Sequence, residues 1–193
     1  MKNIIETEFD RSDIKEYAVK VLSGGRCGFF FPMSFFTKDA GPDTLIAATD
    51  ISGFRKVSEY ENLSQTETLD ILIGLLKGMT GAAMNYLFPW NYEISPDTIY
   101  FSEKTEQVKC RFIPRSSEDA DIIPTSEVIT KRVREFADAL RPLVSEECEA
   151  ITDESERELA AHAFSFDQSV SALRSLRIRV ARESRTSEQA AAL

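Results

Sequence analysis

Residues 64–87 read SQTETLDILIGLLKGMTGAAMNYL and contain the clearest structural signal in the chain. Ser64 and Glu67 have the S-x-x-E spacing of a capping box, in which each side chain bonds the backbone N–H of the other residue. Apolar residues then recur at helical spacing on one face: Leu69, Leu72, Ile73, Leu76, Met79, Ala83, Tyr86 and Leu87. We therefore predict a long central helix from about Gln65 to Leu87.

Three glycines, Gly74, Gly78 and Gly81, lie inside this helix at a spacing that places them near one another. Each costs about 1 kcal/mol relative to alanine in a helix interior. We infer that the helix backbone packs closely against a neighbouring element at these positions. Asp70 and Lys77 interrupt the apolar run, so a contact between helices of a soluble domain is expected rather than one inside a membrane.

The composition excludes several classes of protein. The 193 residues include 32 acidic and 23 basic side chains, a formal net charge of −9, so a general nucleic-acid binder, which is normally basic, is not expected. The length fits one domain, or a small domain with an appendage. The apolar stretches fall short of the ~20 residues that span a bilayer, and the N-terminus lacks the apolar core of a secretory signal. We expect a cytoplasmic protein without a membrane span.

Cysteine and histidine are few in this chain. Cys27, Cys110 and Cys148 are far apart and form no C-x-x-C pair, so we interpret them as reduced, mostly buried thiols. His162 is the only histidine, which makes a histidine-rich metal site or a catalytic triad hard to assemble. No spacing in the chain implies a metal or a cofactor.

The segments on either side of the central helix predict a mixed α+β fold. The elements expected before it are a strand at Ile4–Phe9, a short helix at Ile14–Leu22, an aromatic strand within 29–36, a turn at Lys38–Asp43 and a strand at Thr44–Ile51 that forms a hairpin with the aromatic one. Those expected after it are a loop at Pro89–Pro96, a β-hairpin of strands at Thr98–Phe101 and Val108–Ile113, an acidic linker at Ser116–Asp121, and helices at Ser126–Leu140, Glu154–Phe164 and Asp167–Arg182.

The order of these elements matters more than any single motif. A strand ends in TDISG (residues 49–53), the long helix follows, a loop then reads NYEISPDTIY (91–100), and a polar turn leads to VKCRFIP (108–114). This order resembles the middle of a protein kinase. EISPDTIYF looks like the DIKPENILL stretch of a catalytic loop, and VKC looks like the VKL that precedes the DFG triplet. The resemblance covers roughly residues 45–114.

The chain is more similar still to degenerate kinase-like (pseudokinase) domains of bacteria. One is the domain N-terminal to forkhead-associated modules, and another is the cytosolic domain of the EssB/YukC component of type VII secretion. The matching residues are Tyr17–Leu22, Phe31-Pro32, Asp50–Gly53 and Ile94–Tyr100, which extend the resemblance to roughly residues 13–114. We therefore divide the chain into a small kinase-like domain (1–115), a helical C-terminal region (116–183) and a disordered tail (184–193).

Phosphoryl transfer requires side chains that this kinase-like segment lacks. A kinase holds the nucleotide phosphates with a glycine-rich loop and a strand lysine, and binds Mg²⁺ through an asparagine and the DFG aspartate. Neither the glycine-rich loop nor the lysine in its V-A-I-K context is present. By the resemblance, Glu93 stands at the catalytic base, Ser95 replaces the loop lysine, Thr98 replaces the asparagine, and Phe112 stands at the DFG aspartate. We regard these four as degenerate positions and expect no catalytic residue and no enzyme activity.

Our main hypothesis is therefore a catalytically inactive protein-interaction or scaffold module in bacterial signalling or a secretion-associated assembly. Its partners would be proteins, and a homo-oligomer is possible. The candidate partner-binding residues are Trp90 and a basic helical stretch: Leu173, Arg174, Leu176, Arg177 and Val180. The same stretch also fits a packed terminal helix with a solvated arginine face, and Trp90 also fits a core position.

Two other functions stay open at this point. An atypical nucleotide-binding phosphotransferase would use Glu93 with carboxylates from elsewhere, such as Asp97 or Asp50. A small structural or chaperone-like subunit would bind a basic partner through its acidic helical C-terminus, since residues 118–158 contain 13 acidic and 5 basic side chains. Residues 174–188 contain 5 arginines and 2 glutamates, so this basic segment can also fold back on the acidic one.

Overall fold

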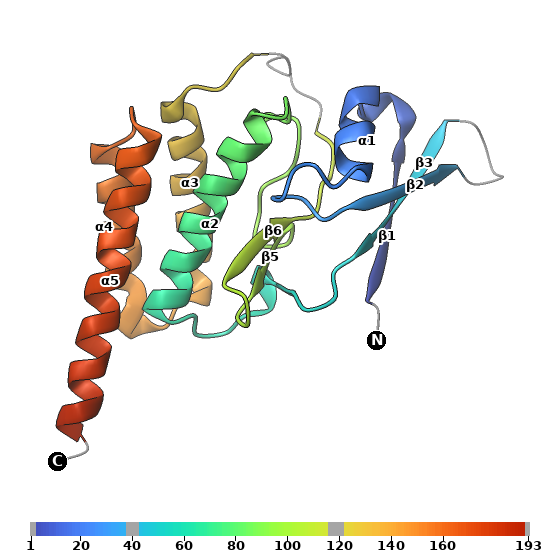
Figure 1. Cartoon of the computed structure of the whole chain (residues 1–193). Coiled ribbons are helices and arrows are strands. Elements are labelled where there is room, and N and C mark those ends of the chain that lie inside the picture. The colour runs from blue at the N-terminus through green and yellow to red at the C-terminus, as the bar shows by residue number, and fades with distance from the viewer. Residues whose placement is uncertain (1–2, 38–42, 116–121, 192–193) are drawn as a thin grey trace.

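The computed structural model describes residues 3–37, 43–115 and 122–191. The fold is mixed α+β, as the sequence predicts. The helices α2 (Gln65–Ala83), α3 (Ser126–Leu140), α4 (Glu149–Ala161) and α5 (Phe166–Ala191) form a layer at one end of the molecule, on the left of Figure 1. A sheet and the short helix α1 (Glu16–Ser23) lie at the other end, and a β-hairpin lies between the two (Figure 1).

The sheet at the N-terminal end contains three antiparallel strands in the order β1-β3-β2. They are β1 (Ile4–Asp10), β2 (Met33–Thr37) and β3 (Thr44–Asp50). The predicted strands at Ile4–Phe9 and Thr44–Ile51 are confirmed, and β2 and β3 pair as the expected hairpin. Only the second half of the aromatic stretch belongs to this hairpin, however. The predicted turn at Lys38–Asp43 lies, apart from Asp43, outside the described residues.

The first half of the aromatic stretch connects the two sheets. The second sheet has the order β4-β5-β6, with β4 (Arg55–Lys56), β5 (Ile99–Ser102) and β6 (Gln107–Cys110). The Cys110 N–H donates to the Phe29 carbonyl at 2.7 Å, and the Phe31 N–H donates to the Cys110 carbonyl at 3.3 Å. Residues 29–31 therefore run beside β6, while residues 33–37 run beside β3.

The central helix begins where the sequence predicts and ends earlier. Both bonds of the capping box are present, because the Glu67 N–H donates to Ser64 Oγ at 3.3 Å and the Ser64 N–H donates to Glu67 Oε2 at 2.9 Å. α2 ends at Ala83, before the predicted Leu87, and Tyr86 adopts a left-handed conformation with φ of 60°. The chain therefore turns sharply after α2 and enters the loop that precedes β5.

The helical C-terminal region matches the prediction at α3 and differs at the next two helices. α4 begins at Glu149 rather than at Glu154, and α5 continues past Arg182 to Ala191. Helix thus occupies most of the segment 184–193, for which we expected disorder. Adding residues to an existing helix needs no new nucleation, and this segment is rich in alanine, glutamate, glutamine and arginine, which favour helix. The predicted acidic linker lies outside the described residues.

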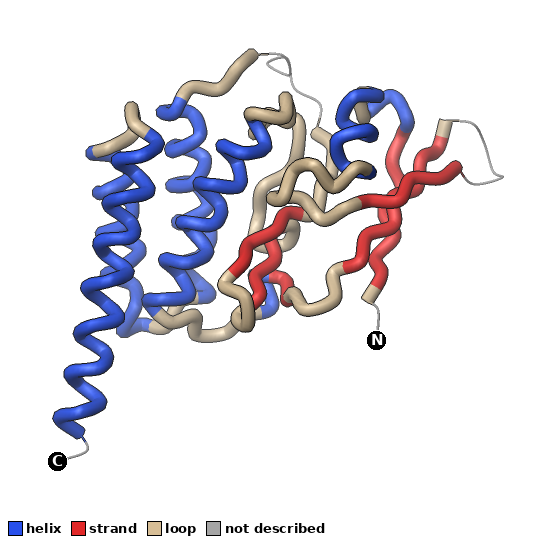
Figure 2. Tube along the Cα trace, in the orientation of Figure 1, coloured by secondary structure: helices blue, strands red, loops and turns tan. Residues whose placement is uncertain are grey.

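α2 lies at the boundary between the helices and the strands, and it forms the centre of the core (Figure 2). Seven of its apolar side chains are fully buried: Leu69, Ile71, Leu72, Leu75, Leu76, Met79 and Ala82. One continuous apolar cluster extends from Ile14 of the N-terminal end to Val180 of α5. Cys27, Cys110 and Cys148 are free and buried, as predicted. None of the helices in the described part of the chain has the length and apolarity to cross a membrane.

Two of the three helix glycines make the close contacts that the sequence predicts. A Cβ at Gly74 would lie 2.5 Å from Val108 Cγ2, and a Cβ at Gly78 would lie 2.0 Å from a ring carbon of Phe29. A Cβ at Gly81 would meet no atom within 4 Å. The predicted partner was wrong, because these glycines face β6 and the aromatic connection rather than another helix. A hairpin strand and a ring can approach a glycine as closely as a second helix can.

This difference between the glycines predicts opposite effects of alanine. Gly78→Ala should lower the free energy of unfolding by about 1–3 kcal/mol, because the new methyl group overlaps the buried Phe29 ring. Gly81→Ala is the matched control in the same helix and should raise it by up to about 1 kcal/mol through helix propensity alone. Urea denaturation measures both values. Equal effects of the two substitutions would contradict the close contact at Gly78.

Candidate functional site

The loop around Glu93 satisfies its polar groups internally. Ser95 Oγ donates to Glu93 Oε1 at 3.0 Å, and the Ser95 N–H donates to Thr98 Oγ1 at 3.0 Å. The Thr98 hydroxyl donates in turn to the Glu93 carbonyl at 3.1 Å. Thr98 is buried and Glu93 is half-buried. These three side chains therefore hold the turn before β5 in shape, as Ser, Thr and acidic residues commonly do in loops.

The two carboxylates considered as helpers of Glu93 also have local partners. Asp97 Oδ1 accepts from Ser58 Oγ at 2.7 Å. Asp50 Oδ1 accepts from the N–H and the hydroxyl of Ser52, at 3.0 and 2.6 Å. Across residues 3–37, 43–115 and 122–191, no group of three or more His, Cys, Asp or Glu side chains could hold a metal ion. These carboxylates are used for turns and for contacts between loops.

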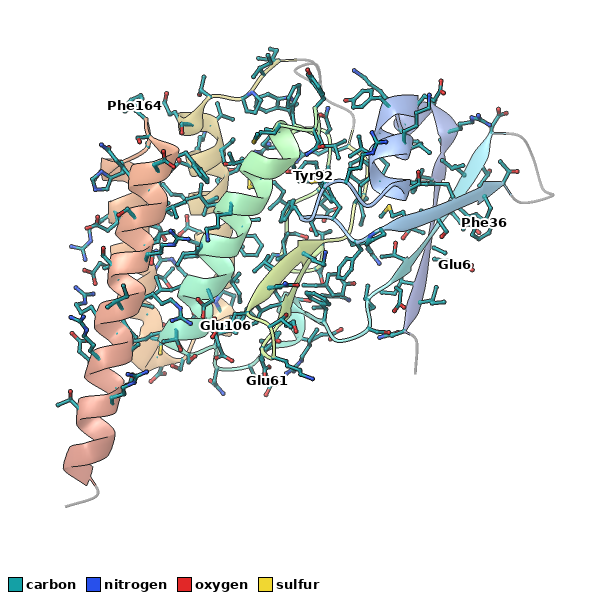
Figure 3. All side chains as sticks on the ribbon, viewed as in Figure 1. Glu6, Phe36, Glu61, Tyr92, Glu106 and Phe164 are labelled. Atoms are coloured by element: carbon teal, nitrogen blue, oxygen red, sulfur yellow. The ribbon has the colours of Figure 1, made fainter. Side chains whose placement is uncertain are left out.

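Phe112 belongs to an aromatic cluster in the interior. Its ring centroid lies 5.5 Å from that of Phe30 and 6.0 Å from that of Tyr92, and Phe30 and Tyr92 meet edge to face at 4.9 Å. Such edge-to-face pairs are favourable beyond the area that they bury. Figure 3 shows Tyr92 between the helical layer and the sheet. Burial raises the pKa of the Tyr92 hydroxyl well above its usual range, so this phenol stays neutral.

Two small cavities border this cluster and the loop. One of about 160 Å³ lies against α1 and is lined in part by Asn91, Phe112 and Arg115. The other, of about 110 Å³, is lined in part by Tyr92 and Ser95. Both are smaller than the roughly 300–1,000 Å³ of a typical small-molecule site. The rings of the aromatic cluster fill the space beside the loop.

A larger open cavity lies on the other face of α2, and we call it the α2–α5 groove. Its volume is about 620 Å³. α2 and α5 form its walls and the turn between β5 and β6 closes one end, where Figure 3 shows Glu106. The residues that line it are Gly28, Asp70, Ile73, Gly74, Lys77, Glu106, Gln107, Val108, Lys109, Arg174 and Arg177. Charged side chains surround a floor of small and apolar residues.

Arg177 fixes the shape of this groove. Its guanidinium donates to both carboxylate oxygens of Asp70 on α2, with an Nη2–Oδ2 distance of 2.9 Å for one of the two bonds. Nη2 also donates to Glu106 Oε1 at 3.1 Å. One side chain of α5 thus joins α2 and the hairpin turn, and the planar guanidinium suits such a bidentate contact. The hydrogen bonds raise the pKa of Arg177, so this charge is permanent.

The predicted partner-binding residues fall into two groups. Leu173, Leu176 and Val180 are buried in the core, with 0%, 6% and 2% of their surface exposed, so they are not part of an external surface. An apolar stripe with this spacing on α5 can face either the core or a partner, and here it faces the core. Arg174 and Arg177 do line the α2–α5 groove. Trp90 is half-buried, with its ring 6.3 Å from that of Phe88.

The acidic helices pair much of their charge inside the molecule. Arg141 binds Asp138 at 3.0 Å and Asp153 at 2.7 Å, and it also contacts Glu156. Arg179 of α5 donates to both oxygens of Glu154 on α4, with an Nη1–Oε1 distance of 2.8 Å. The predicted contact between the basic and acidic segments is therefore present. These pairs reduce the negative charge available to a basic partner.

Sequence reasoning missed Lys77, Lys109 and Glu106 as parts of a site. The available signal was the interruption of the apolar helix pattern, because Asp70, Gly74 and Lys77 lie at i, i+4 and i+7 and so share one stripe of α2. When the other faces of a helix are buried, a polar stripe that contains a glycine indicates an open surface that a ligand could contact.

The fold and the groove define a small mixed α+β domain with an open, charged groove beside its central helix. No family model matches the chain, and no curated protein matches its sequence. Among solved structures, the chain is similar to the cytoplasmic fragment of ESSB from Staphylococcus aureus, with 16% sequence identity and a TM-score of 0.41. The matched region covers 86% of this chain and 81% of that one.

The Arg179–Glu154 pair predicts a pH-dependent contribution to stability. Arg179 holds the pKa of the Glu154 carboxyl below its ordinary value of 4.5, so the pair stabilises the fold above that pH and loses its effect as the pH falls through the lowered pKa. Arg179→Gln should therefore lower the free energy of unfolding at pH 7 by roughly 0.2–1 kcal/mol, the range for exposed ion pairs. Urea denaturation at pH 7 and at pH 3 measures the difference.

Arg182→Gln is the matched control, because Arg182 is an exposed arginine of the same helix and takes no part in the Arg179–Glu154 pair. It should leave the difference between the two pH values as in the unsubstituted protein. If Arg179→Gln destabilised the fold equally at both pH values, its effect would not come from the charge of Glu154.

Proposed function

We propose that this chain is a catalytically inactive, kinase-like domain that binds other proteins as a scaffold in a bacterial signalling or secretion-associated assembly. The resemblance of Asp50–Gly53 and Ile94–Tyr100 to bacterial pseudokinase domains supports the kinase-like part of the proposal. The arrangement of the elements also supports it. A sheet with one helix is followed by a long helix, a loop and a hairpin, in the order that the resemblance implies.

The observation that carries the proposal is the burial of Phe112 in an aromatic cluster. A kinase places a Mg²⁺-binding carboxylate at this position, and Mg²⁺ takes oxygen ligands. Here Phe112 is 2% exposed and packs against Phe30 and Tyr92, so the position offers a ring in place of an oxygen. Glu93, at the position of the catalytic base, accepts a hydrogen bond from Ser95. Both side chains serve the fold.

The α2–α5 groove supports a binding role. It is open to solvent and has a volume of about 620 Å³, several times that of the cavities beside the Glu93 loop. Its walls come from two helices that Arg177 holds together. A charged surface whose walls are already joined in this way can bind a partner without a conformational change in the domain.

Thermal melting with and without millimolar ATP and Mg²⁺ tests the proposal. A ligand present at 100 times its dissociation constant stabilises a protein by about 2.7 kcal/mol. For a chain of this length, that stabilisation raises the melting temperature by roughly 5–10 °C. We expect no Mg²⁺-dependent rise, because the loop and the aromatic cluster leave neither a nucleotide-sized cavity nor a metal ligand set at the Glu93 loop.

The control is the same melt with inorganic phosphate and Mg²⁺, which separates a nucleotide effect from an effect of ionic strength. A rise with ATP and Mg²⁺ alone, which Glu93→Gln abolishes, would contradict the proposal and favour the phosphotransferase. A rise that survives Glu93→Gln would show a nucleotide site elsewhere in the molecule and would also contradict the inactive, scaffold-only role.

A further inference from the structure

We propose that the α2–α5 groove binds an acidic segment of a partner protein, and that Lys77 and Arg174 hold its carboxylates. This inference rests on the proposed function, because it names the chemistry of the partner that the domain would bind. It uses a face of α2 that the aromatic cluster does not occupy.

The floor of the groove lets a peptide approach closely. A Cβ at Gly74 would overlap Val108, so the helix and the hairpin meet there and close the floor. Gly28 lines one side, and a Cβ at that position would meet no atom within 4 Å, so the space above it is open. Ile73 and Val108 add apolar surface to the floor. An extended peptide can therefore lie against this strip while its polar side chains reach the walls.

The lining of the groove is cationic although the chain as a whole is acidic. It contains the four basic side chains Lys77, Lys109, Arg174 and Arg177 and the two acidic ones Asp70 and Glu106, so it has a net charge of +2. The formal net charge of the chain is −9. A local patch of the opposite sign attracts a ligand that the rest of the surface repels, and so favours one orientation of binding.

The four basic side chains of the groove differ in whether they already have hydrogen-bond or ion-pair partners within the fold. Arg177 bonds Asp70 and Glu106, and Lys109 Nζ donates to the Gly28 carbonyl at 2.9 Å. Among the described residues, the side chains of Lys77 and Arg174 form no ion pair. They come from α2 and α5, the two opposite walls. Lys77 and Arg174 are thus the charges that a ligand would neutralise.

Lys77 and Arg174 also influence each other. Partial burial, and after it the positive charge of Arg174, lower the pKa of the Lys77 ammonium group. Two like charges without a counter-ion weaken the free protein slightly. A carboxylate bound between them would interact favourably with both, and this gain is available only in the complex.

Carboxylates fit this groove better than phosphates do. Phosphate sites in proteins commonly use the bidentate arginine fork or the N–H groups of a helix N-terminus. Here the fork of Arg177 is occupied by Asp70, so Arg174 alone offers an open fork, and the groove lies along the middle of α2 and α5 rather than at their N-termini. Asp70 and Glu106 would repel a doubly charged phosphate more than a single carboxylate. The apolar floor further favours a peptide over a nucleic acid.

Fluorescence anisotropy with a fluorescein-labelled peptide of alternating glutamate and alanine tests the proposal at low ionic strength. We expect saturable binding by the full chain that weakens with added salt, because exposed charges are screened. The double variant Lys77→Glu/Arg174→Glu should lose at least about tenfold in affinity. A peptide of alternating lysine and alanine should not bind in the groove.

Two controls separate the groove from the overall charge. Lys131→Glu/Arg182→Glu makes the same change in net charge at exposed positions outside the groove and should bind the acidic peptide as the unsubstituted chain does. Gly28→Glu should weaken binding more than Gly28→Gln, which adds the same volume without charge. Equal losses in both double variants would overturn the groove as the binding site.

The remaining outcomes are also decisive. Absence of saturable binding to the unsubstituted chain would overturn this inference while leaving the proposed function standing, since ATP and Mg²⁺ test the latter separately. Competition by inorganic phosphate or single-stranded RNA at lower concentrations than by unlabelled acidic peptide would overturn the choice of carboxylates. The proposal would be supported if the unsubstituted chain bound the acidic peptide in preference to these competitors and Lys77→Glu/Arg174→Glu lost that binding.

Discussion

The contact between α2 and β6 holds the two ends of the molecule together. Gly74 admits Val108 and Gly78 admits Phe29, so the helix backbone reaches the hairpin and the aromatic connection with no side chain between them. α2 is covered on its other faces by α3 and α5, and most of its apolar side chains are fully buried. The strands and the helices share one core because this helix contacts both. That contact requires glycine at positions 74 and 78.

The aromatic cluster follows from the same contact. Phe29 sits against Gly78, and the hydrogen bonds of residues 29 and 31 to Cys110 place Phe30 beside Tyr92 and Phe112. Rings that pack edge to face in this way are favourable beyond the area that they bury. The polar side chains of the loop before β5 bond one another, so this loop is held as a structural turn beside the cluster.

The sequence predicted local features well and spatial partners less well. The capping box, α3 and the two hairpins follow from spacing and turn residues, which act over a few positions. The partner of the helix glycines and the burial of Leu173 and Val180 depend on elements distant in the chain. An apolar stripe has the same spacing whether it faces the core or another protein, so periodicity alone could not separate the two. The groove was missed because its lining comes from four segments of the chain.

The charges of the helical layer explain how a basic groove persists on an acidic chain. Arg141 and Arg179 pair with acidic residues of α3 and α4, whereas Arg177 pairs across to α2 and to the hairpin turn. Asp70 therefore has a partner of its own on α5. Lys77 lies seven residues, or about two helical turns, further along the same face of α2, which is beyond the i,i+4 spacing at which side chains of one helix form ion pairs. Arg177 thus sets the shape of the groove, whereas the spacing of Asp70 and Lys77 along α2 leaves its cation on that helix unpaired among the described residues.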